Sequence, residues 1–258
     1  MNIDLYQVDA FTDRPFHGNP AAICPLESWL SDELMQAIAA ENNLSETAFL
    51  VSAGNRYQLR WFTPVSEVDL CGHATLAAAF VVFLQNDTVR RVEFDTRSGL
   101  LAVEKDGAWF RMDFPAWTAA PFAAPALLFD ALRVEAKEIY KARDVLVVLN
   151  SESEIKAVQP DFALLEQIDA LGVVVSARGT DADFVSRFFA PREGIPEDPV
   201  TGSSHSMLVP FWANRLHKTE LLAKQLSKRG GVLRCRHCGD RVEIAGQAVL
   251  FSRGLICL

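Results

Sequence analysis

A nine-residue segment without a polar side chain, Leu76–Leu84 (LAAAFVVFL), limits the folds open to this chain more than any other feature. A helix that is hydrophobic on every face must be enclosed on all sides, so other elements have to surround it. A second segment, Pro199–Asn214, contains no Asp, Glu, Lys or Arg. Pro210 is expected to limit the helix in this second segment to about two turns, because proline lacks the N–H that a helix interior needs.

The two halves of the chain repeat one pattern ahead of these segments. A shift of 127 positions places Arg60, Trp61, Phe62 and Pro64 on Arg187, Phe188, Phe189 and Pro191. The expected elements follow the same order, a helix and then two strands: a helix capped by Ser31 and running to about Asn42 with strands near 48–52 and 57–63, and a helix over 161–169 with strands near 172–176 and 184–189. Hairpin-like strands follow each buried segment, over 91–114 and 231–249. The shared order favours an internal duplication.

These patterns predict an α+β protein with two pseudo-symmetric domains, each a mostly antiparallel sheet curled around a buried helix. Two such units are expected to meet at a cleft, which is a common place for a small-molecule site. The uncharged, Ala- and Pro-rich segment Ala116–Pro125 is the expected linker.

Composition excludes several classes of protein. The 258 residues include 33 acidic and 25 basic side chains, a net charge of −8, which argues against a nucleic acid or an anionic membrane as partner. No run approaches the roughly 20 apolar residues of a membrane span, and the N-terminus carries acids where a signal peptide carries bases. Five scattered cysteines do not form a disulfide framework. A soluble, cytoplasmic protein is expected.

Two candidate helix starts carry small residues that suit anion binding. The shift places Cys71 (CGHAT) opposite Asp198 (DPVTGSS). Free amides at a helix N-terminus bind carboxylates and stabilise developing oxyanions, so Gly72 and Gly202 mark two half-sites for a small acid. Alternatively, the glycines only permit tight turns and Asp198 only caps its helix.

Three polar residues are candidates for the chemistry itself. Glu46 lies beside Leu44 and Phe49, where partial desolvation suits a carboxylate to general acid/base work, or it is a surface residue at a helix end. Its counterpart under the shift is Val173. His73 can donate to a substrate or pass a proton, or it is structural. Asn19, in the turn HGNP, can offer its amide to a ligand or form an Asx turn.

Two further motifs indicate no site of their own. Cys235, His237 and Cys238 (CRHC) have a short metal-ligand spacing, but no second pair completes a zinc site. Ser203 and Ser204 precede His205 without the GxSxG turn of a nucleophilic serine.

Four motifs in order resemble one family. GNPAA, NLSETAF, WFTP followed by LCGHATLA, and FAP followed by GIPEDPVTGS are similar to the PhzF family of phenazine-biosynthesis-like isomerases. The resemblance runs from Gln7 to at least Ser206, with a weaker tail at GGVLR and RVEIAGQAVL.

The resemblance implies the diaminopimelate epimerase fold, with the active site between two similar domains. The expected domains are residues 1–117, joined by a C-terminal tail of about 250–258, and residues 118–249. A homodimer that needs no metal or organic cofactor is also implied.

Carried over by position, Glu46 matches the family's proton-transferring glutamate, and His73 and Asp198 match two further catalytic positions. The matching substrate-binding positions are Asn19, Ser45, Cys71, Gly72, Thr201, Gly202 and Ser203. Related racemases use two cysteines from opposite faces, whereas here Asp198 stands opposite Cys71. The departure favours an isomerase that removes a proton from a small carboxylated metabolite and returns it on the same face. An amino or hydroxy acid epimerase, or a catalytically silent acid-binding protein, is the alternative.

Overall fold

The computed structural model describes residues 1–136 and 138–258. The chain divides into two compact units: unit 1 is Met1–Asp113 with Ala245–Leu258, and unit 2 is Phe114–Ile244. Within the described residues, no helix combines the length and the apolar character that crossing a bilayer requires.

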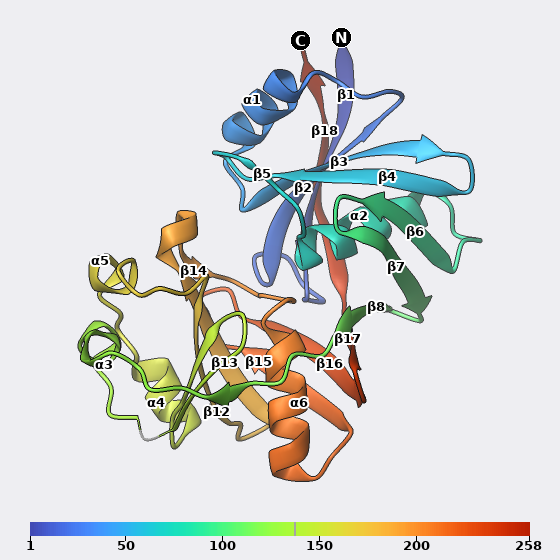
Figure 1. Ribbon diagram of the computed structural model, residues 1–258. Helices are drawn as coiled ribbons and strands as arrows, with labels where there is room; N and C mark the ends of the chain where they lie inside the picture. Colours follow the sequence, from blue (N-terminus) through green and yellow to red (C-terminus); the bar gives the residue numbers. More distant parts are fainter. Residues whose placement is uncertain (137) are drawn as a thin grey trace. The chain divides into compact units, whose positions relative to one another are not determined.

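Unit 1 is a set of strands around one helix (Figure 1). Its elements are β1 (Asn2–Ala10), β2 (Asn19–Leu26), α1 (Asp32–Asn42), β3 (Glu46–Ala53), β4 (Arg56–Phe62), β5 (Glu67–Val68), α2 (Gly72–Gln85), β6 (Arg91–Thr96), β7 (Gly99–Asp106), β8 (Trp109–Pro115) and β18 (Ala248–Cys257). Strand β2 is antiparallel to β1 and parallel to β3, β4 is antiparallel to β3 and parallel to β6, and β6, β7 and β8 form an antiparallel meander.

Unit 2 repeats this arrangement. Its elements are β9 (Ala120–Pro121), α3 (Ala126–Leu132), β10 (Glu138–Lys141), β11 (Val145–Val148), α4 (Glu152–Ala157), α5 (Phe162–Leu165), β12 (Val173–Arg178), β13 (Phe184–Ala190), a 3-10 turn (Pro191–Glu193), β14 (Ile195–Asp198), α6 (His205–Leu216), β15 (Glu220–Gln225), β16 (Gly231–Cys238) and β17 (Arg241–Gly246). Strand β11 is antiparallel to β10 and parallel to β12, and β13 is antiparallel to β12 and parallel to β15.

Side chains confirm the duplication. Arg60 forms a two-bond fork to Glu67, with donor–acceptor distances of 2.7 and 2.8 Å, and its guanidinium lies over Phe62. Arg187 forms the same fork to Glu197, at 2.7 and 3.0 Å, and lies over Phe189. Arg60 and Phe62 in unit 1 therefore make the same kind of contacts as Arg187 and Phe189, their counterparts under the sequence shift, make in unit 2.

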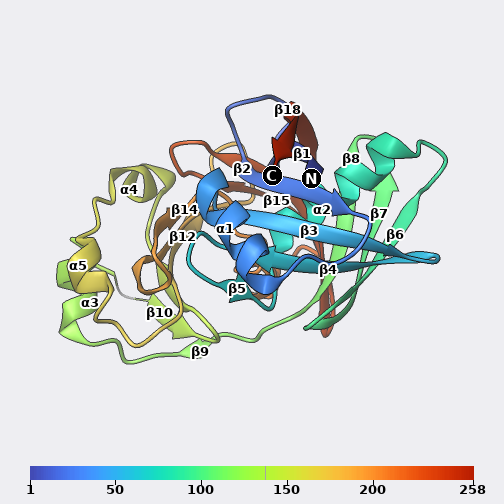
Figure 2. The same ribbon diagram turned by 90° about the horizontal axis from the view of Figure 1, so that it is seen from above.

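Helix α2 contains the apolar segment Leu76–Leu84 that the sequence marks as enclosed. It contacts β1, β2, β3, β7 and β18, and its side chains are buried from Gly72 to Phe83 except at Phe80 (Figures 1 and 2). The C-terminal strand β18 contributes to this enclosure, because it pairs along the length of β1, from Ala10↔Ala248 to Asn2↔Cys257. The predicted domain limits, 117 and about 250, lie a few residues from the limits of the two units.

Helix α6 corrects the prediction drawn from Pro210. The helix runs for 12 residues with Pro210 inside it. A proline at this position leaves the carbonyl of Ser206 without its intrahelical donor. The backbone N–H of Trp117 donates to that carbonyl at 2.8 Å, so the polar group stays satisfied and the helix continues.

The segment expected to be a linker is part of unit 2. Ala116 donates its backbone N–H to Asp240, and β9 pairs with β10. The helix expected over 161–169 is also shorter, since α5 ends at Leu165.

Candidate active site

The candidate site in unit 1 lies where two strands begin and helix α2 begins. Glu46 is the first residue of β3 and pairs with Ala21 in the parallel strand β2, which starts at Asn19. Cys71 is extended and immediately precedes α2, and its carbonyl accepts the first backbone bond of the helix, from Thr75. The fold thus gathers the ETAF, GNP and CGH motifs at one place.

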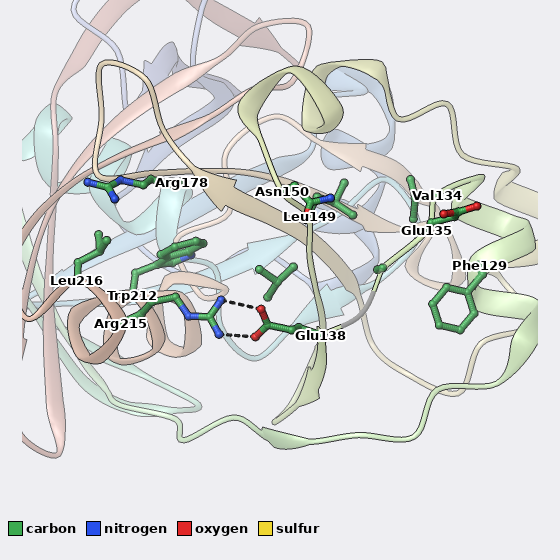
Figure 3. A pocket seen from close by; sticks show the side chains of 12 residues that line it. Phe129, Val134, Glu135, Glu138, Leu149, Asn150, Arg178, Trp212, Arg215 and Leu216 are labelled. Atoms are coloured by element: carbon green, nitrogen blue, oxygen red, sulfur yellow. Dashed lines mark hydrogen bonds and ion pairs between the residues drawn. The ribbon is translucent and has the colours of Figure 1, made fainter.

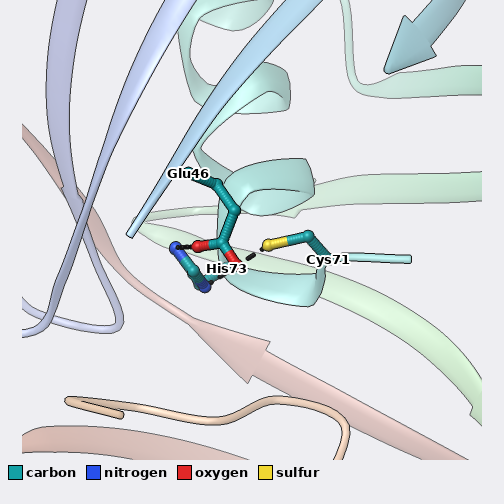
Figure 4. Close-up of side chains that lie close together, drawn as sticks. All are labelled: Glu46, Cys71 and His73. Carbon is teal, nitrogen blue, oxygen red and sulfur yellow. Dashed lines mark hydrogen bonds and ion pairs between the residues drawn. The ribbon is translucent and has the colours of Figure 1, made fainter. Parts of the chain in front are cut away.

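His73 is the centre of this group (Figure 4). Its Nε2 lies 3.0 Å from Oε2 of Glu46, and its Nδ1 lies 3.5 Å from Sγ of Cys71. Nδ2 of Asn19 is 3.1 Å from the same Nδ1. All four residues are buried, Asn19 completely. Ser45 completes the chain of contacts by donating its hydroxyl to Oδ1 of Asn19 at 3.3 Å.

The hydrogen bonds select one tautomer of neutral His73. With the Asn19 amide oriented so that Nδ2 donates, Nδ1 of the imidazole is an acceptor and the ring proton sits on Nε2. That nitrogen lies 3.0 Å from Oε2 of Glu46, an ion-pair contact in which, within the described residues, neither atom completes a hydrogen bond. Neither carboxylate oxygen accepts a hydrogen bond within the described part of the chain, and Oε1, which is not the oxygen in the ion-pair contact with His73, is the one available to an incoming proton.

Electrostatics separates the roles of the two neighbours of His73. Burial lowers the pKa of His73, but the interactions of the ring with Cys71 and Glu46 outweigh burial and hold this pKa well above 6.5. Burial, together with the nearby Glu46 charge, raises the pKa of the Cys71 thiol to about 11. Cys71 therefore keeps its proton at neutral pH.

Glu46, Cys71 and His73 also carry atom types that bind metals, with one ligand atom of each within 4.8 Å of the others. However, Cys71 approaches Nδ1 of the imidazole and Glu46 approaches Nε2. One imidazole gives one nitrogen to a metal ion, so this arrangement fits a proton-transfer network better than a coordination sphere.

The remaining candidates form a second group, in unit 2. Asp198 ends β14, and its Oδ2 accepts from the Thr201 hydroxyl at 2.5 Å. Gln225 holds both residues: its Oε1 accepts from the Thr201 N–H at 2.9 Å, and its Nε2 donates to the Asp198 carbonyl at 2.8 Å. Gln225 lies in a strand with an unremarkable sequence, and nothing in the pattern of ELLAKQ singles it out.

A turn of small residues leads from this group into α6. Gly202, Ser203 and Ser204 form the turn, and the backbone N–H of His205 donates to the carbonyl of Gly202. Ser204, not Asp198, occupies the N-cap position of α6, although its side chain makes no capping hydrogen bond, so the interpretation of Asp198 as a helix cap is wrong. Ser203 receives a hydrogen bond at its hydroxyl from Arg143, at 3.0 Å, which sequence reasoning also missed.

His205 is a structural residue and not part of a serine nucleophile. It is fully buried, its Nδ1 donates to the Thr201 carbonyl at 2.8 Å, and its ring lies against Phe184. Burial lowers the pKa of His205 to about 4, although the bond to Thr201 raises it. The ring is therefore neutral near pH 7.

Two other places contain none of the predicted residues. A cavity of about 840 Å³ in unit 2 is lined by the ion pair Arg215–Glu138 and by Trp212 (Figure 3). In the CRHC segment, Cys235 is buried and Cys238 is exposed, so the two thiols do not converge.

Comparison with known proteins agrees with the fold and the motifs. The family model of phenazine biosynthesis-like proteins, PhzC-PhzF, matches residues 8–254. An uncharacterised isomerase of Pseudomonas aeruginosa is 52% identical over the full length of both chains. The crystal structure of a PhzF-family phenazine biosynthesis protein from Enterococcus faecalis is 46% identical, with a TM-score of 0.97 over all of both chains.

A more distant structure supports the fold class. A hydroxyproline epimerase of Agrobacterium vitis matches with a TM-score of 0.64 at 11% identity, covering 99% of this chain and 92% of that one. The expected fold, two related α+β units of the epimerase type, is confirmed.

Proposed function

The chain belongs to the PhzC-PhzF family of phenazine biosynthesis-like proteins and is an isomerase, and we propose that it moves a proton on a small carboxylated metabolite with Glu46 as the acid/base. The observation that carries the proposal is the buried pair of Glu46 and His73, 3.0 Å apart at Oε2 and Nε2. A buried carboxylate that pairs with an imidazole through one oxygen and leaves the other oxygen uncommitted can accept and return a proton in a fixed direction.

The proposed step balances without a redox partner. Oε1 of Glu46 takes a proton from carbon, and the bonding electrons shift into the adjacent π system as the double bond moves. The protonated Glu46 then delivers the proton to another carbon on the same face. His73, whose Nε2 lies 3.0 Å from Oε2, orients the carboxylate through both half-reactions by this ion-pair contact.

Unit 2 is proposed to bind and orient the substrate. The turn Gly202–Ser204 opens a helix of 12 residues, and amides at such an N-terminus favour a carboxylate. Asp198 is the proposed second proton-handling group, since it is buried and Gln225 and Thr201 fix its position.

Incubation in deuterated water tests the proposal. Dihydro-hydroxyanthranilate and related small acids are followed by NMR with wild type and with Glu46→Gln, each dialysed against a chelator beforehand to test independence from metals. We expect solvent deuterium to enter carbon positions of an accepted acid with wild type only. Equal rates for the two proteins would exclude Glu46 as the base.

The same experiment separates the alternatives. An epimerase would also destroy the optical rotation of a pure enantiomer, which the proposed one-sided transfer does not. A silent binding protein would incorporate no deuterium, and its affinity for the acid would survive Glu46→Ala.

We further propose that the chain works as a homodimer in the cytoplasm. Phe251 and Leu255 on β18 are exposed, and Phe16 packs edge-on against Phe251 with ring centroids 5.5 Å apart. Such an apolar face suits a second copy. Light scattering should give twice the chain mass for wild type and for the control Leu100→Glu, and the single mass for Phe251→Glu with Leu255→Glu. A monomeric wild type would contradict the dimer.

A further inference from the structure

Arg143 is held in place on three sides within unit 2. Its Nε and Nη2 donate to the two carboxylate oxygens of Asp144, at 3.2 and 2.9 Å. Asp144 is fully buried, so this fork is fixed from the protein interior. The third contact is the bond from Nη2 to the hydroxyl of Ser203, in the turn that opens α6.

An aromatic ring supports the guanidinium on one face. The centre of the guanidinium lies 4.7 Å from the ring of Trp117. Trp117 is itself anchored by its backbone N–H, which donates to the Ser206 carbonyl that Pro210 leaves free. Pro210, Trp117 and Arg143 therefore form one continuous support for the turn at Ser203.

One edge of this guanidinium is unused. Within the described residues, Nη1 of Arg143 makes no hydrogen bond or ion pair, although the side chain is only 30% exposed. The side chain lines a shallow, open surface pocket of about 520 Å³ together with Trp117, Thr118, Ala116 and Ala142. A half-buried guanidinium with two uncommitted N–H donors is a preformed site for a carboxylate.

The geometry couples this edge to the proposed substrate site. Nη1 and Nη2 share one carbon in a rigid fork, so Nη1 lies within about 5 Å of the Ser203 hydroxyl that Nη2 contacts. The two oxygens of one carboxylate can span such a distance. A ligand bound at Nη1 therefore lies beside the turn Gly202–Ser204.

The internal duplication supports the position of Arg143 beside the start of the central helix of unit 2. The strand registers pair Ala22 with Thr47 in unit 1 and Val145 with Val173 in unit 2. The start of β2, where Asn19 contacts His73 at the head of α2, thus corresponds to the residues just before β11, where Arg143 contacts Ser203 ahead of α6. In both units, a side chain from this place in the fold contacts the start of the central helix or the turn before it. That side chain is the amide Asn19 in unit 1 and the cation Arg143 in unit 2.

We propose that Arg143 is a specificity residue of this enzyme, binding the carboxylate of the substrate through Nη1 and positioning Ser203 through Nη2. The inference rests on the proposed function for the class of substrate, a small acid. It adds a positively charged recognition group to the amides and hydroxyls of the turn Gly202–Ser204.

Calorimetric titration with a matched pair of probes tests the inference. The probes are 3-hydroxyanthranilate and its uncharged amide, 3-hydroxyanthranilamide, and the proteins are wild type, Arg143→Met, Arg143→Lys and the control Arg178→Met. Arg178 is exposed in the same unit, on β12. We expect wild type and the control to bind the acid at least tenfold more tightly than the amide. Arg143→Met should lose this preference through a tenfold or greater weakening for the acid and less than a threefold change for the amide, with Arg143→Lys in between.

Three results would overturn the inference: no preference for the acid in wild type, an unchanged preference in Arg143→Met, or equal losses for both probes in a folded Arg143→Met. If Arg143→Met does not fold, Arg143→Lys decides, because it keeps the charge and loses the fork. Deuterium exchange with Glu46→Gln separates this inference from the proposed function. If Glu46→Gln exchanges deuterium as fast as wild type while the preference for the acid still depends on Arg143, Glu46 is not the base but Arg143 remains the binding residue.

Discussion

The buried ring of His205 makes the stability of this protein depend on pH in a way that can be calculated. The native pKa of His205 is lowered by burial to about 4, whereas in the unfolded chain it returns to about 6.5. Between these two pKa values, His205 is protonated in the unfolded state and neutral in the native state. The stabilising effect is fully present above pH 6.5 and is lost as the pH falls toward 4.

The magnitude follows from the width of this window. Each pH unit within it changes the free energy of unfolding by about 1.4 kcal/mol, so acidification from pH 6.5 to 4 removes about 3 kcal/mol through His205 alone. His73 acts in the opposite sense, because its raised native pKa contributes stability below pH 6.5 that is lost at high pH. The two contributions can be separated only with a variant.

Urea unfolding of His205→Asn at several pH values makes that separation. Asparagine can still donate to the Thr201 carbonyl but does not titrate, so the difference in unfolding free energy from wild type should shrink by about 3 kcal/mol from pH 6.5 to 4. The control His217→Asn changes an exposed residue with φ of 54°, a conformation that asparagine tolerates. A difference between wild type and His205→Asn that stays constant with pH would refute the reasoning.

Two further predictions concern Cys71 and Gly172. At pH 8, iodoacetamide should alkylate exposed Cys238 at least tenfold faster than Cys71, because Cys71 is buried and its pKa is about 11. Mass spectrometry of the peptides measures the two rates, and fast alkylation of Cys71 would instead indicate a reactive thiolate. Gly172→Ala should destabilise the protein by about 1–3 kcal/mol in urea unfolding, since its Cβ would lie 2.2 Å from the Phe188 ring; Gly254→Ala, with nothing within 4 Å, should change stability little, and equal effects would contradict the packing argument.

Local patterns in the sequence were sufficient to predict much of the fold. The apolar segment Leu76–Leu84 lies within α2, and the charge-free segment Pro199–Asn214 covers most of α6. Ser31 caps α1 by accepting from Leu34, and the arginines matched by the shift, Arg60 and Arg187, each form an Arg–Glu fork. These features depend on residues close together in the chain. They follow from periodicity and capping without knowledge of the tertiary structure.

The exact correspondence between the halves could not be predicted. Thr47 pairs with Phe62 in unit 1 and Val173 pairs with Phe189 in unit 2, so the hairpin of unit 2 has one additional residue. The structural counterpart of Glu46 is therefore Gly172 and not Val173. A side chain at Gly172 would collide with Phe188, which explains why only unit 1 carries a carboxylate at this position.

The residues that sequence reasoning missed act over long distances in the chain. Gln225 contacts Thr201 across 24 positions, and Arg143 contacts Ser203 across 60. Pro210 misled for a similar reason, because the donor that replaces its missing N–H comes from Trp117. Only the tertiary fold supplies these partners.

Proton exchange at carbon tests the central claim about Glu46 most directly. Wild type, Glu46→Gln and the control Glu41→Gln, which removes an exposed carboxylate on α1, are compared in deuterated water with the acid that wild type accepts. We expect wild type and Glu41→Gln to incorporate deuterium at the same rate and Glu46→Gln to be slower by at least a hundredfold, as for the loss of a general acid/base group. Exchange by folded Glu46→Gln within a fewfold of wild type would contradict the assignment of Glu46 as the group that moves the proton.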